Sequence, residues 1–315
     1  IGAYVHNNNV TDKRTDDAAA LRAVNPRITL VRIDAQDSDA NWKPLGAFST
    51  FAIHGTGIPP FTHPYHGDVW AFIERDLETR IANHYHPSWK PIHGSFEANH
   101  GDNNPNYHAG LRGDSETRRI GQMIARQSWK LFRELDSQLQ DSALVRHAMR
   151  EIDVLEPRSD ETHLLCDRAI IGAATVGAAK GDEVFPISYL PPFAAGWPKT
   201  LFTDNCHAQK NWMLSWLQVW GLQPERYPHK INATALQIGD FVLVGLPFEI
   251  TFEAGNRIRN AVQQSLANVG EHPSHIAISS HTNGFFGYST TPEEYSQQYY
   301  EGGHTIYGPG TTEFL

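Results

Sequence analysis

Short strand-like runs alternate with helical repeats along most of this chain, and this alternation constrains the fold more than any other feature. Residues 28–35 and 47–54 are rich in β-branched and aromatic side chains and are bounded by polar or Pro/Gly segments, which is typical of strands. Residues 69–84 and 114–139 place apolar side chains at helical spacing. The pattern predicts an α/β fold with mixed β-sheets flanked by amphipathic helices, in one large domain over residues 1–315.

The second half of the chain continues the pattern. Residues 233–247 hold two apolar runs on either side of Gly239–Asp240, which predicts a hairpin turn at that dipeptide. Residues 248–270 repeat apolar side chains at helical spacing as far as Gly270, a residue type that commonly ends helices. Residues 275–280 predict a strand that leads into a polar and aromatic loop.

Two local features refine the expected helices. Either Asp114 or Ser115 is expected to cap the helix that starts there, because both side chains can accept a backbone N–H bond. Trp212, Trp216 and Trp220 are spaced four residues apart, so they would share one helix face. That face would belong either to the core or to the wall of an apolar groove, and we expect the core.

Composition excludes several classes of protein. The chain is 40% apolar and 11% aromatic, which is too much for a disordered tail. No stretch reaches the roughly 18 consecutive apolar residues that a membrane-spanning helix needs. The formal net charge is −9 with no basic cluster in the sequence, so nucleic acid is not an expected partner.

Both ends of the sequence suggest that it is part of a longer protein. The chain begins with Ile1 and has no charged segment followed by an apolar one, so a signal peptide is absent from these residues, although one could have been removed upstream. The last residues, 307–315, stop without a helix cap or a polar tail. We therefore expect further sequence on both sides.

The two cysteines, Cys166 and Cys206, leave two alternatives open. Neither belongs to a Cys-x-x-Cys motif, which excludes a four-thiolate zinc site. They could be two unrelated buried thiols. They could equally form one disulfide, which would indicate an oxidising compartment.

Three junctions between a strand and a loop hold residues that could bind a metal ion. His54 ends one strand-like run, Glu249 follows another at the start of a helix, and Tyr288 follows a third. The chain contains 17 histidines, and neutral imidazole is the commonest metal ligand in proteins. An imidazole, a carboxylate and a phenol could together hold a divalent ion. Alternatively, His54 is an ordinary loop histidine and Glu249 a charge favoured by the helix dipole.

Five segments, in the same order, resemble the neutral (alkaline, non-lysosomal) ceramidases, and the resemblance extends from about residue 28 to the end. It implies a zinc-dependent amidase that cleaves the N-acyl bond of ceramide to release sphingosine and a fatty acid, with Zn²⁺ as its cofactor. The segments are FAIHGTG (51–57), GDNNPN (101–106), NCHAQK (205–210), LVGLPFEIT (243–251) and GYSTTPEEYSQQYYEGGHTIYGP (287–309).

The resemblance also implies roles for individual residues. The family holds its zinc with two His, one Glu and one Tyr, and His54, Glu249 and Tyr288 match three of these. Tyr300 matches a second tyrosine that hydrogen-bonds the reacting carbonyl. Cys166 and Cys206 stand where family members form a disulfide, which implies a secreted, periplasmic or otherwise extracellular location.

The sequence departs from the family at its metal and substrate motifs. The second zinc histidine lies in a Thr-His-Thr-His-Ser-Gly motif that does not occur here, so we expect it before Ile1, with His63 or His66 as the alternative. An Asn-Arg-Ser loop expected near the start is also absent. These residues also lack the immunoglobulin-like domain that follows the catalytic domain in the family.

The family's nucleophile is also replaced. The family reads Gly-Asp-x-Ser-Pro-Asn, and Asn104 takes the place of the Ser, two residues after Asp102. An amide is not a nucleophile, but it can donate a hydrogen bond to a carbonyl oxygen. We therefore expect water activated by the zinc to attack directly, with Asn104 and Tyr300 polarising the carbonyl.

These observations predict a zinc-dependent amidohydrolase that acts on ceramide or a related N-acyl lipid, with possible peripheral contact to a membrane. Because the Ser and Arg are absent, two alternatives remain. The protein could be a metal hydrolase with a different N-acyl or ester substrate, or a non-catalytic relative that binds lipid in the same pocket.

Overall fold

The computed structural model contains two compact units, each of which is described by itself. Unit 1 comprises Ile1–Tyr4, Val24–Ala98 and Asn103–Ala143; unit 2 comprises Val5–Ala23, Asn99–Asp102 and Leu144–Leu315. The structure describes residues 3–5, 24–62, 65–108, 110–156, 164–179, 182–197, 206–210 and 215–315.

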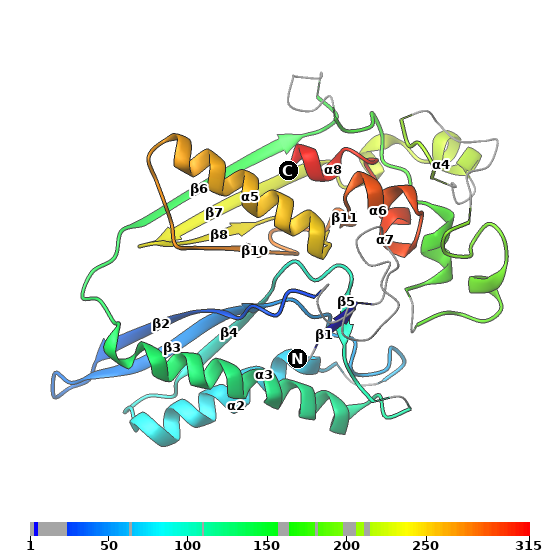
Figure 1. The fold of residues 1–315 in the computed structure, drawn as a ribbon. Helices are drawn as coiled ribbons and strands as arrows, with labels where there is room; N and C mark the ends of the chain where they lie inside the picture. The colour runs from blue at the N-terminus through cyan, green and yellow to red at the C-terminus, as the bar shows by residue number, and fades with distance from the viewer. Residues whose placement is uncertain are drawn as a thin grey trace. The chain divides into compact units, whose positions relative to one another are not determined.

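Unit 1 is built on a three-stranded mixed sheet. Strand β3 (Trp42–Phe51) lies between β2 (Thr29–Gln36), to which it is antiparallel, and β4 (Ile92–Glu97), to which it is parallel. Helices α2 (Asp68–Tyr85) and α3 (Asp114–Glu134) lie side by side on one face of this sheet (Figure 1). A two-stranded sheet is formed by β1 (Ala3–Val5) and β5 (Asn103–Pro105).

The strands and helices predicted for this region are confirmed, because the apolar stripes of the sequence are the buried faces. Leu77 and Ile81 of α2 and Phe132 of α3 are fully buried and pack with Ala47 of β3. The predicted cap of α3 is wrong, because Gly113 is the N-cap and no side chain caps the helix. Asp114 lies instead within the first helical turn, where the helix dipole still favours a carboxylate.

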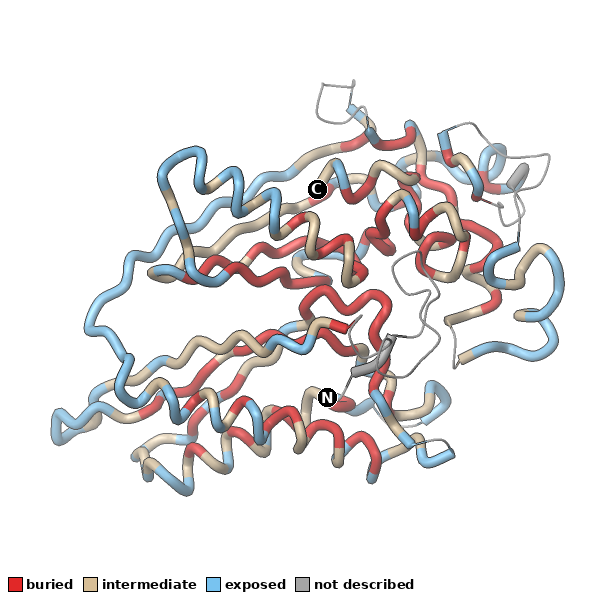
Figure 2. The backbone as a smooth tube through the Cα atoms, in the orientation of Figure 1, coloured by how far each residue is buried: buried red, intermediate tan, exposed pale blue. Residues whose placement is uncertain are grey.

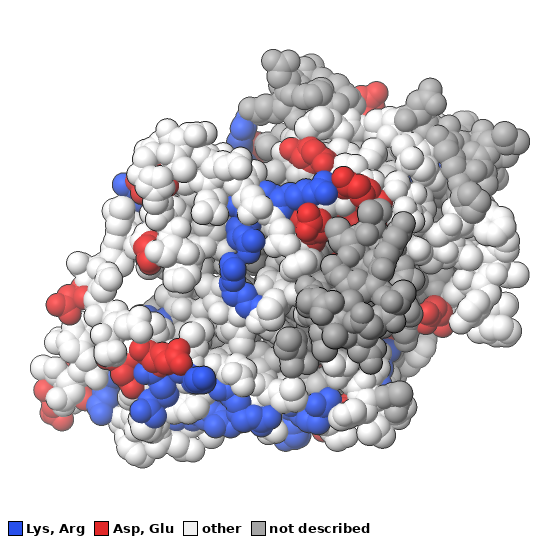
Figure 3. Space-filling view, in the orientation of Figure 1, with Lys and Arg blue, Asp and Glu red and all other residues white. Residues whose placement is uncertain are grey.

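Basic side chains gather along α3, as Figure 3 shows over the lower part of the molecule. Several of them are matched by nearby carboxylates, so this stripe is largely compensated in charge. Arg118 pairs with Asp114, Arg119 with Glu116, and Arg133 with Asp136.

Unit 2 is built on a four-stranded mixed sheet in the order β10-β8-β7-β6. Its strands are β6 (Val145–Asp153), β7 (Lys230–Ile238), β8 (Phe241–Gly245) and β10 (His275–Ser279). Strand β8 is parallel to β10 and antiparallel to β7, and α5 (Phe252–Asn268) packs against β10 (Figure 1). Buried residues follow β8 and β10, where the core of this unit lies (Figure 2). The mixed sheets and flanking helices confirm the predicted α/β class.

The predicted hairpin is also confirmed. Gly239 and Asp240 join β7 to β8, and Gly239 has a φ of +57°, which a glycine adopts without strain. The remaining elements of unit 2 are short: α4 (Ser215–Gly221), β9 (Glu249–Ile250), β11 (Tyr288–Ser289), α6 (Pro292–Ser296), α7 (Tyr300–Gly303) and α8 (Thr311–Phe314). Among the described residues, no helix is both long and apolar enough to cross a lipid bilayer.

The expectation that the tryptophan stripe forms core is wrong at Trp220, which is 81% exposed. Gln218 of α4 is buried, and its side chain accepts from the Ile171 N–H and donates to the Ile171 carbonyl, each at 2.9 Å. A side-chain amide therefore fixes this helix to the segment at Ile171. Trp212 and the side chain of Trp216 lie outside the described residues.

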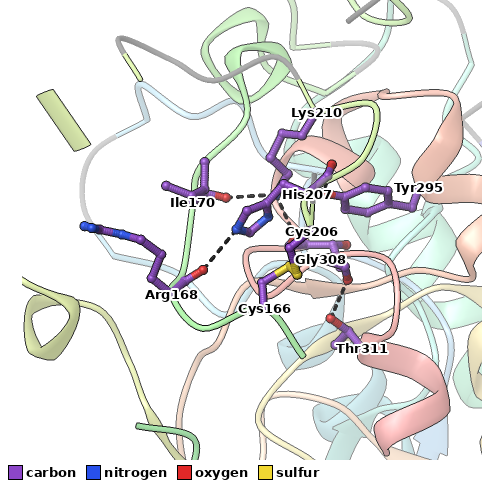
Figure 4. Close-up of a disulfide and its surroundings, with 10 residues drawn as sticks. Cys166, Arg168, Ile170, Cys206, His207, Lys210, Tyr295, Gly308 and Thr311 are labelled. Atoms are coloured by element: carbon purple, nitrogen blue, oxygen red, sulfur yellow. Dashed lines mark hydrogen bonds between the residues drawn. A yellow bond between two sulfur atoms is a disulfide. The ribbon is translucent and has the colours of Figure 1, made fainter. Parts of the chain in front are cut away.

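Cys166 and Cys206 form a disulfide, as the resemblance implied (Figure 4). The chain next to it runs beside residues 303–307, since the N–H groups of Cys166 and Ile170 donate to the carbonyls of Tyr307 and Ile306 at 2.9 Å. A side chain at Gly308 would bring its Cβ to 2.5 Å from the Cys166 Sγ, so this position requires glycine. The disulfide thereby fixes the segment that follows α7.

Lys210 reinforces the same region from within (Figure 4). Its ammonium group is completely buried and donates to the carbonyls of Ile170, at 2.8 Å, and Thr305, at 2.7 Å. Burial lowers the pKa of Lys210 well below its usual range. The lysine side chain therefore joins the segment that follows Cys166 to the segment that follows α7.

We expect the double variant Cys166→Ala/Cys206→Ala to lose about 4 kcal/mol of unfolding free energy, because the bond closes a loop with a sequence separation of 40. Denaturant unfolding of the two proteins side by side measures the difference. Reduction of the wild-type protein should lower its midpoint in the same direction. An unchanged midpoint in both experiments would contradict the structural role of the bond.

Candidate functional site

A short parallel strand pair places Glu249 beside Tyr288. The two residues are register partners in β9 and β11, so their Cα atoms lie at the spacing of neighbouring strands, about 4.8 Å. The Glu249 N–H donates to the Gly287 carbonyl at 3.0 Å, and the Thr251 N–H donates to the Ser289 carbonyl at 3.1 Å. Two of the residues singled out in the sequence are therefore brought together by backbone hydrogen bonds.

The side chains of this pair are also joined. The Tyr288 hydroxyl donates to the Glu249 carboxylate, and both residues are buried. Burial, with the neighbouring negative charge of Glu249, raises the pKa of Tyr288 well above its usual range. Without a bound cation, the phenol therefore keeps its proton at neutral pH.

Tyr300 and His304 complete an aromatic cluster around Tyr288. The Tyr288 ring lies 5.6 Å from the Tyr300 ring and 5.7 Å from the His304 ring. Helix α7 spaces Tyr300 and His304 one turn apart, and the His304 N–H donates to the Tyr300 carbonyl at 3.0 Å. Burial raises the pKa of Tyr300 to about 12 and lowers that of His304. Tyr300 is therefore a hydroxyl donor at neutral pH.

The sequence TTPEEY explains why α6 begins where it does. Thr291 is the N-cap, Pro292 occupies the first turn, and Glu294 completes a capping box with Thr291. The Glu294 carboxylate also accepts from the hydroxyl of Thr251, the residue before α5, at 2.5 Å. Glu294 thus joins the ends of β9 and β11, which gives this motif a structural role.

Two histidines that the sequence analysis did not single out lie next to Glu249. The His281 Nε2 lies 3.3 Å from one carboxylate oxygen of Glu249, and the His100 Nε2 lies 3.9 Å from the other. The two imidazole rings are 5.3 Å apart. The signals available in the sequence were the abundance of histidine and the position of His281 directly after the strand-like run 275–280.

The segment 99–102 holds His100 against β9 and the start of α5. The Gly101 N–H donates to the Ile250 carbonyl at 2.8 Å, and the Asp102 carboxylate accepts from the Phe252 N–H at 2.9 Å. Asp102 is completely buried, and its charge lies at a helix N-terminus, where the dipole favours an anion. The Gly-Asp part of the motif 101–106 therefore has a clear positioning role.

We expect Gly101→Ala to destabilise the protein by about 1–3 kcal/mol, because its Cβ would lie 3.0 Å from backbone atoms of residues 249–251. Gly94→Ala is the matched control, since its Cβ would meet only the Phe48 Cβ, at 4.0 Å. Thermal unfolding of both variants tests the difference. Equal stability of the two would show that this close approach is not needed.

Unit 1 contains the other predicted site residues, His54 and Asn104. The His54 Nδ1 lies 2.9 Å from the Asn103 carbonyl oxygen. Because a carbonyl can only accept, Nδ1 carries the proton and Nε2 carries the lone pair, which is the usual arrangement of a metal-binding histidine. The Asn104 side-chain oxygen accepts from the Thr56 hydroxyl at 3.0 Å.

The alternative ligands named for the second histidine position are His63 and His66. His63 lies outside the described residues. His66 is exposed, and its Nδ1 accepts from the Asp68 N–H at 3.3 Å. A cavity of about 570 Å³ in unit 1 lies between its sheet and α3, but none of the predicted site residues lines it.

Residues 111–315 match the sequence profile of a protein family described as neutral/alkaline non-lysosomal ceramidase, N-terminal. "Neutral ceramidase 1" of Arabidopsis thaliana is 30% identical over 217 residues, which are 62% of this chain and 27% of that protein. "Neutral ceramidase" of Pseudomonas aeruginosa is 29% identical over 308 residues, which are 87% of this chain and 42% of that protein. The chain therefore spans less than half of either relative.

Solved structures show the same fold. The crystal structure of neutral ceramidase from Pseudomonas aeruginosa matches 99% of this chain and 50% of its own, with a TM-score of 0.70 and 23% identity. A structure described as ceramidase complexed with C2 matches 99% of this chain and 52% of its own, with a TM-score of 0.73 and 23% identity.

Proposed function

This chain belongs to the neutral/alkaline non-lysosomal ceramidase family, and we propose that it forms part of a zinc-dependent amidohydrolase. The substrate is ceramide or a related N-acyl lipid, which is cleaved into a fatty acid and a sphingoid-type amine. The observation that carries the proposal is the pairing of Glu249 with Tyr288, with Tyr300 beside them in the same buried cluster.

The chemistry of the donor set fits a zinc ion. We assign His54, Glu249 and Tyr288 as its ligands, in agreement with the family resemblance. His54 has the required tautomer, with Nδ1 bonded to a backbone carbonyl. When bound, Zn²⁺ supplies Lewis-acid polarisation of the amide carbonyl and lowers the pKa of water towards about 7.

Within this site, the protein's own residues orient the substrate and hold protons. Tyr300 keeps its hydroxyl proton up to a pH of about 12, so it can donate a hydrogen bond to the reacting carbonyl oxygen. The Asn104 amide can donate a second hydrogen bond to the same oxygen as negative charge develops there. Asp102 fixes the start of α5, directly after β9, and so holds Glu249 in position.

The disulfide supports an extracytoplasmic location for the protein, because such bonds persist in oxidising compartments. An N-acyl lipid substrate resides in membranes, so we also propose peripheral contact with a lipid surface. Asn104, in place of a nucleophilic hydroxyl, favours one second candidate: a relative that binds the lipid without cleaving it.

We expect purified protein supplied with zinc to hydrolyse ceramide or a simpler N-acyl amide, and Glu249→Gln to reduce both bound zinc and turnover at least about a hundredfold. The reason is that the carboxylate is the charged ligand of the set. Elemental analysis and release of fatty acid measure the two effects. Glu253→Gln is the matched control, since Glu253 pairs with Arg257 on the outer part of α5.

Normal turnover in Glu249→Gln would mean that the ligand set is wrong. Bound zinc and bound lipid without any hydrolysis would favour the non-catalytic candidate instead.

We expect Asn104→Ser to retain or increase amide hydrolysis, because it restores a hydroxyl at the position where the family has its nucleophile. Initial rates on the same substrates measure the change. Asn106→Ser, at an exposed position of the same motif, is the control. Complete loss of a measurable wild-type activity in Asn104→Ser would show that the amide itself has a role that a hydroxyl cannot replace.

A further inference from the structure

We propose that the cavity in unit 1 between the sheet and α3 binds a free fatty acid, with the acyl chain on its apolar wall and the carboxylate at Arg126 and Lys130. None of the residues assigned to zinc or to the reacting carbonyl lines this cavity, so it is a second site. A fatty acid is also a product of the proposed reaction. The identity of the natural ligand therefore rests on the proposed function, whereas the binding itself does not.

The cavity has the size and the wall of a small-molecule site. It lies where α3 runs beside β2, one of the two edge strands of the three-stranded sheet. Its volume is about 570 Å³, and pockets for small ligands typically enclose about 300–1,000 Å³ within mostly apolar walls. The apolar side chains of this wall are Pro26, Ile28, Phe51, Met123, Ile124 and Leu131.

Part of this apolar wall is accessible to a ligand. Phe51 and Ile124 are buried, whereas Ile28, Met123 and Leu131 are only half-buried. An acyl chain in the cavity would remove the remaining apolar surface of these three side chains from water, which favours binding. The flexible thioether of Met123 can also adapt to chains of different shape.

The cationic side chains of α3, which contribute to the basic stripe in Figure 3, divide into two groups. Arg118, Arg119 and Arg133 pair with nearby carboxylates. The charged groups of Arg126 and Lys130 are exposed and have no ion pair or hydrogen bond within the described part of the chain. Both of these side chains line the cavity. The uncompensated cations of α3 are therefore the two that a bound anion can contact.

The helix presents these two cations together. Arg126 and Lys130 are four residues apart and so are neighbours on one face of α3. The amide of Gln127, which also lines the cavity, can donate a further hydrogen bond. Glu134 is the single carboxylate in the lining among the described residues, and it is exposed. Two cations and one carboxylate leave the lining with a net positive charge.

An apolar wall next to unpaired cations matches an amphiphile with one acyl chain and an anionic head group. A small inorganic anion would leave the apolar wall in contact with water, and an uncharged hydrocarbon would make no use of Arg126 and Lys130. The formal net charge of the whole chain is −9, so attraction of an anion to this place depends on the local arrangement of charge.

The test is equilibrium binding of decanoate, below its micelle concentration, to purified protein without added zinc or N-acyl substrate. Isothermal titration calorimetry gives the affinity and the stoichiometry. Decanol has the same chain length without the charge, and butanoate has the charge with a short chain. We expect one decanoate per protein chain and binding of either control compound that is at least about tenfold weaker.

We expect the double variant Arg126→Gln/Lys130→Gln to bind decanoate about tenfold more weakly and decanol as before, because it removes charge and retains good helix formers. Added salt should weaken decanoate binding to the wild-type protein and have little effect on the double variant. Arg118→Gln is the matched control, since Arg118 is exposed on the same helix and pairs with Asp114.

A second variant tests the apolar wall. We expect Ile28→Asp to weaken the binding of both decanoate and decanol, because it places a carboxylate on the surface that the chain contacts. Ile28 is half-buried and directly precedes β2, so the change leaves the core of unit 1 intact. Circular dichroism and thermal unfolding establish that each variant is folded.

Wild-type affinity for decanoate in the folded double variant would overturn the inference, and so would equal binding of decanol and decanoate by the wild-type protein. Binding to anionic phospholipid vesicles without saturable binding of decanoate would overturn it in favour of a membrane surface. Protein that binds decanoate but hydrolyses no N-acyl lipid would count against the proposed function alone. Active protein that does not bind decanoate would count against this site alone.

Discussion

The parallel pairing of β9 with β11 is the interaction on which the site in unit 2 depends. Each strand contains only two residues, yet their register makes Glu249 and Tyr288 neighbours. Neither strand could persist alone, because so short a pair has few hydrogen bonds to offset its conformational entropy. Its geometry is maintained by the elements that follow each strand, α5 after β9 and α6 after β11.

Polar side chains join those elements to one another. Glu294 accepts hydrogen bonds from both Thr251 and Thr291, so a single buried carboxylate fixes the residues before α5 and α6. Asp102 accepts from the first N–H of α5 and brings the segment that contains His100 to the same place. Buried groups of this kind stabilise a structure only when they are fully bonded, which makes the arrangement specific.

The disulfide region supports the other side of the cluster. Lys210 donates to the Thr305 carbonyl, and the chain after Cys166 is bonded to residues 303–307, which begin three positions after Tyr300. The covalent bond and the buried ammonium group therefore restrict the segment that presents Tyr300 and His304. A stability element far from Glu249 in the sequence thereby contributes to the geometry around Tyr288.

The sequence by itself determined the elements of regular structure and the family. Apolar side chains repeat at helical spacing in α2, α3 and α5, because burial of one helix face requires that periodicity. The strand-like runs 28–35 and 47–54 fall on β2 and β3. Two expectations drawn from local patterns were wrong. Trp220 of α4 is exposed, whereas Gln218 of the same helix is buried and bonded to Ile171, and α3 begins at Gly113 without a side-chain cap.

Only the tertiary structure decided which titratable groups meet. Glu249 and Tyr288 could be named from motifs, but the position of His100 and His281 beside Glu249 could not, because these three residues come from separate stretches of chain. Their proximity follows from backbone pairing between β9, the segment 99–102 and the loop after β10. Periodicity describes one element at a time, whereas contacts between distant residues depend on how those elements pack.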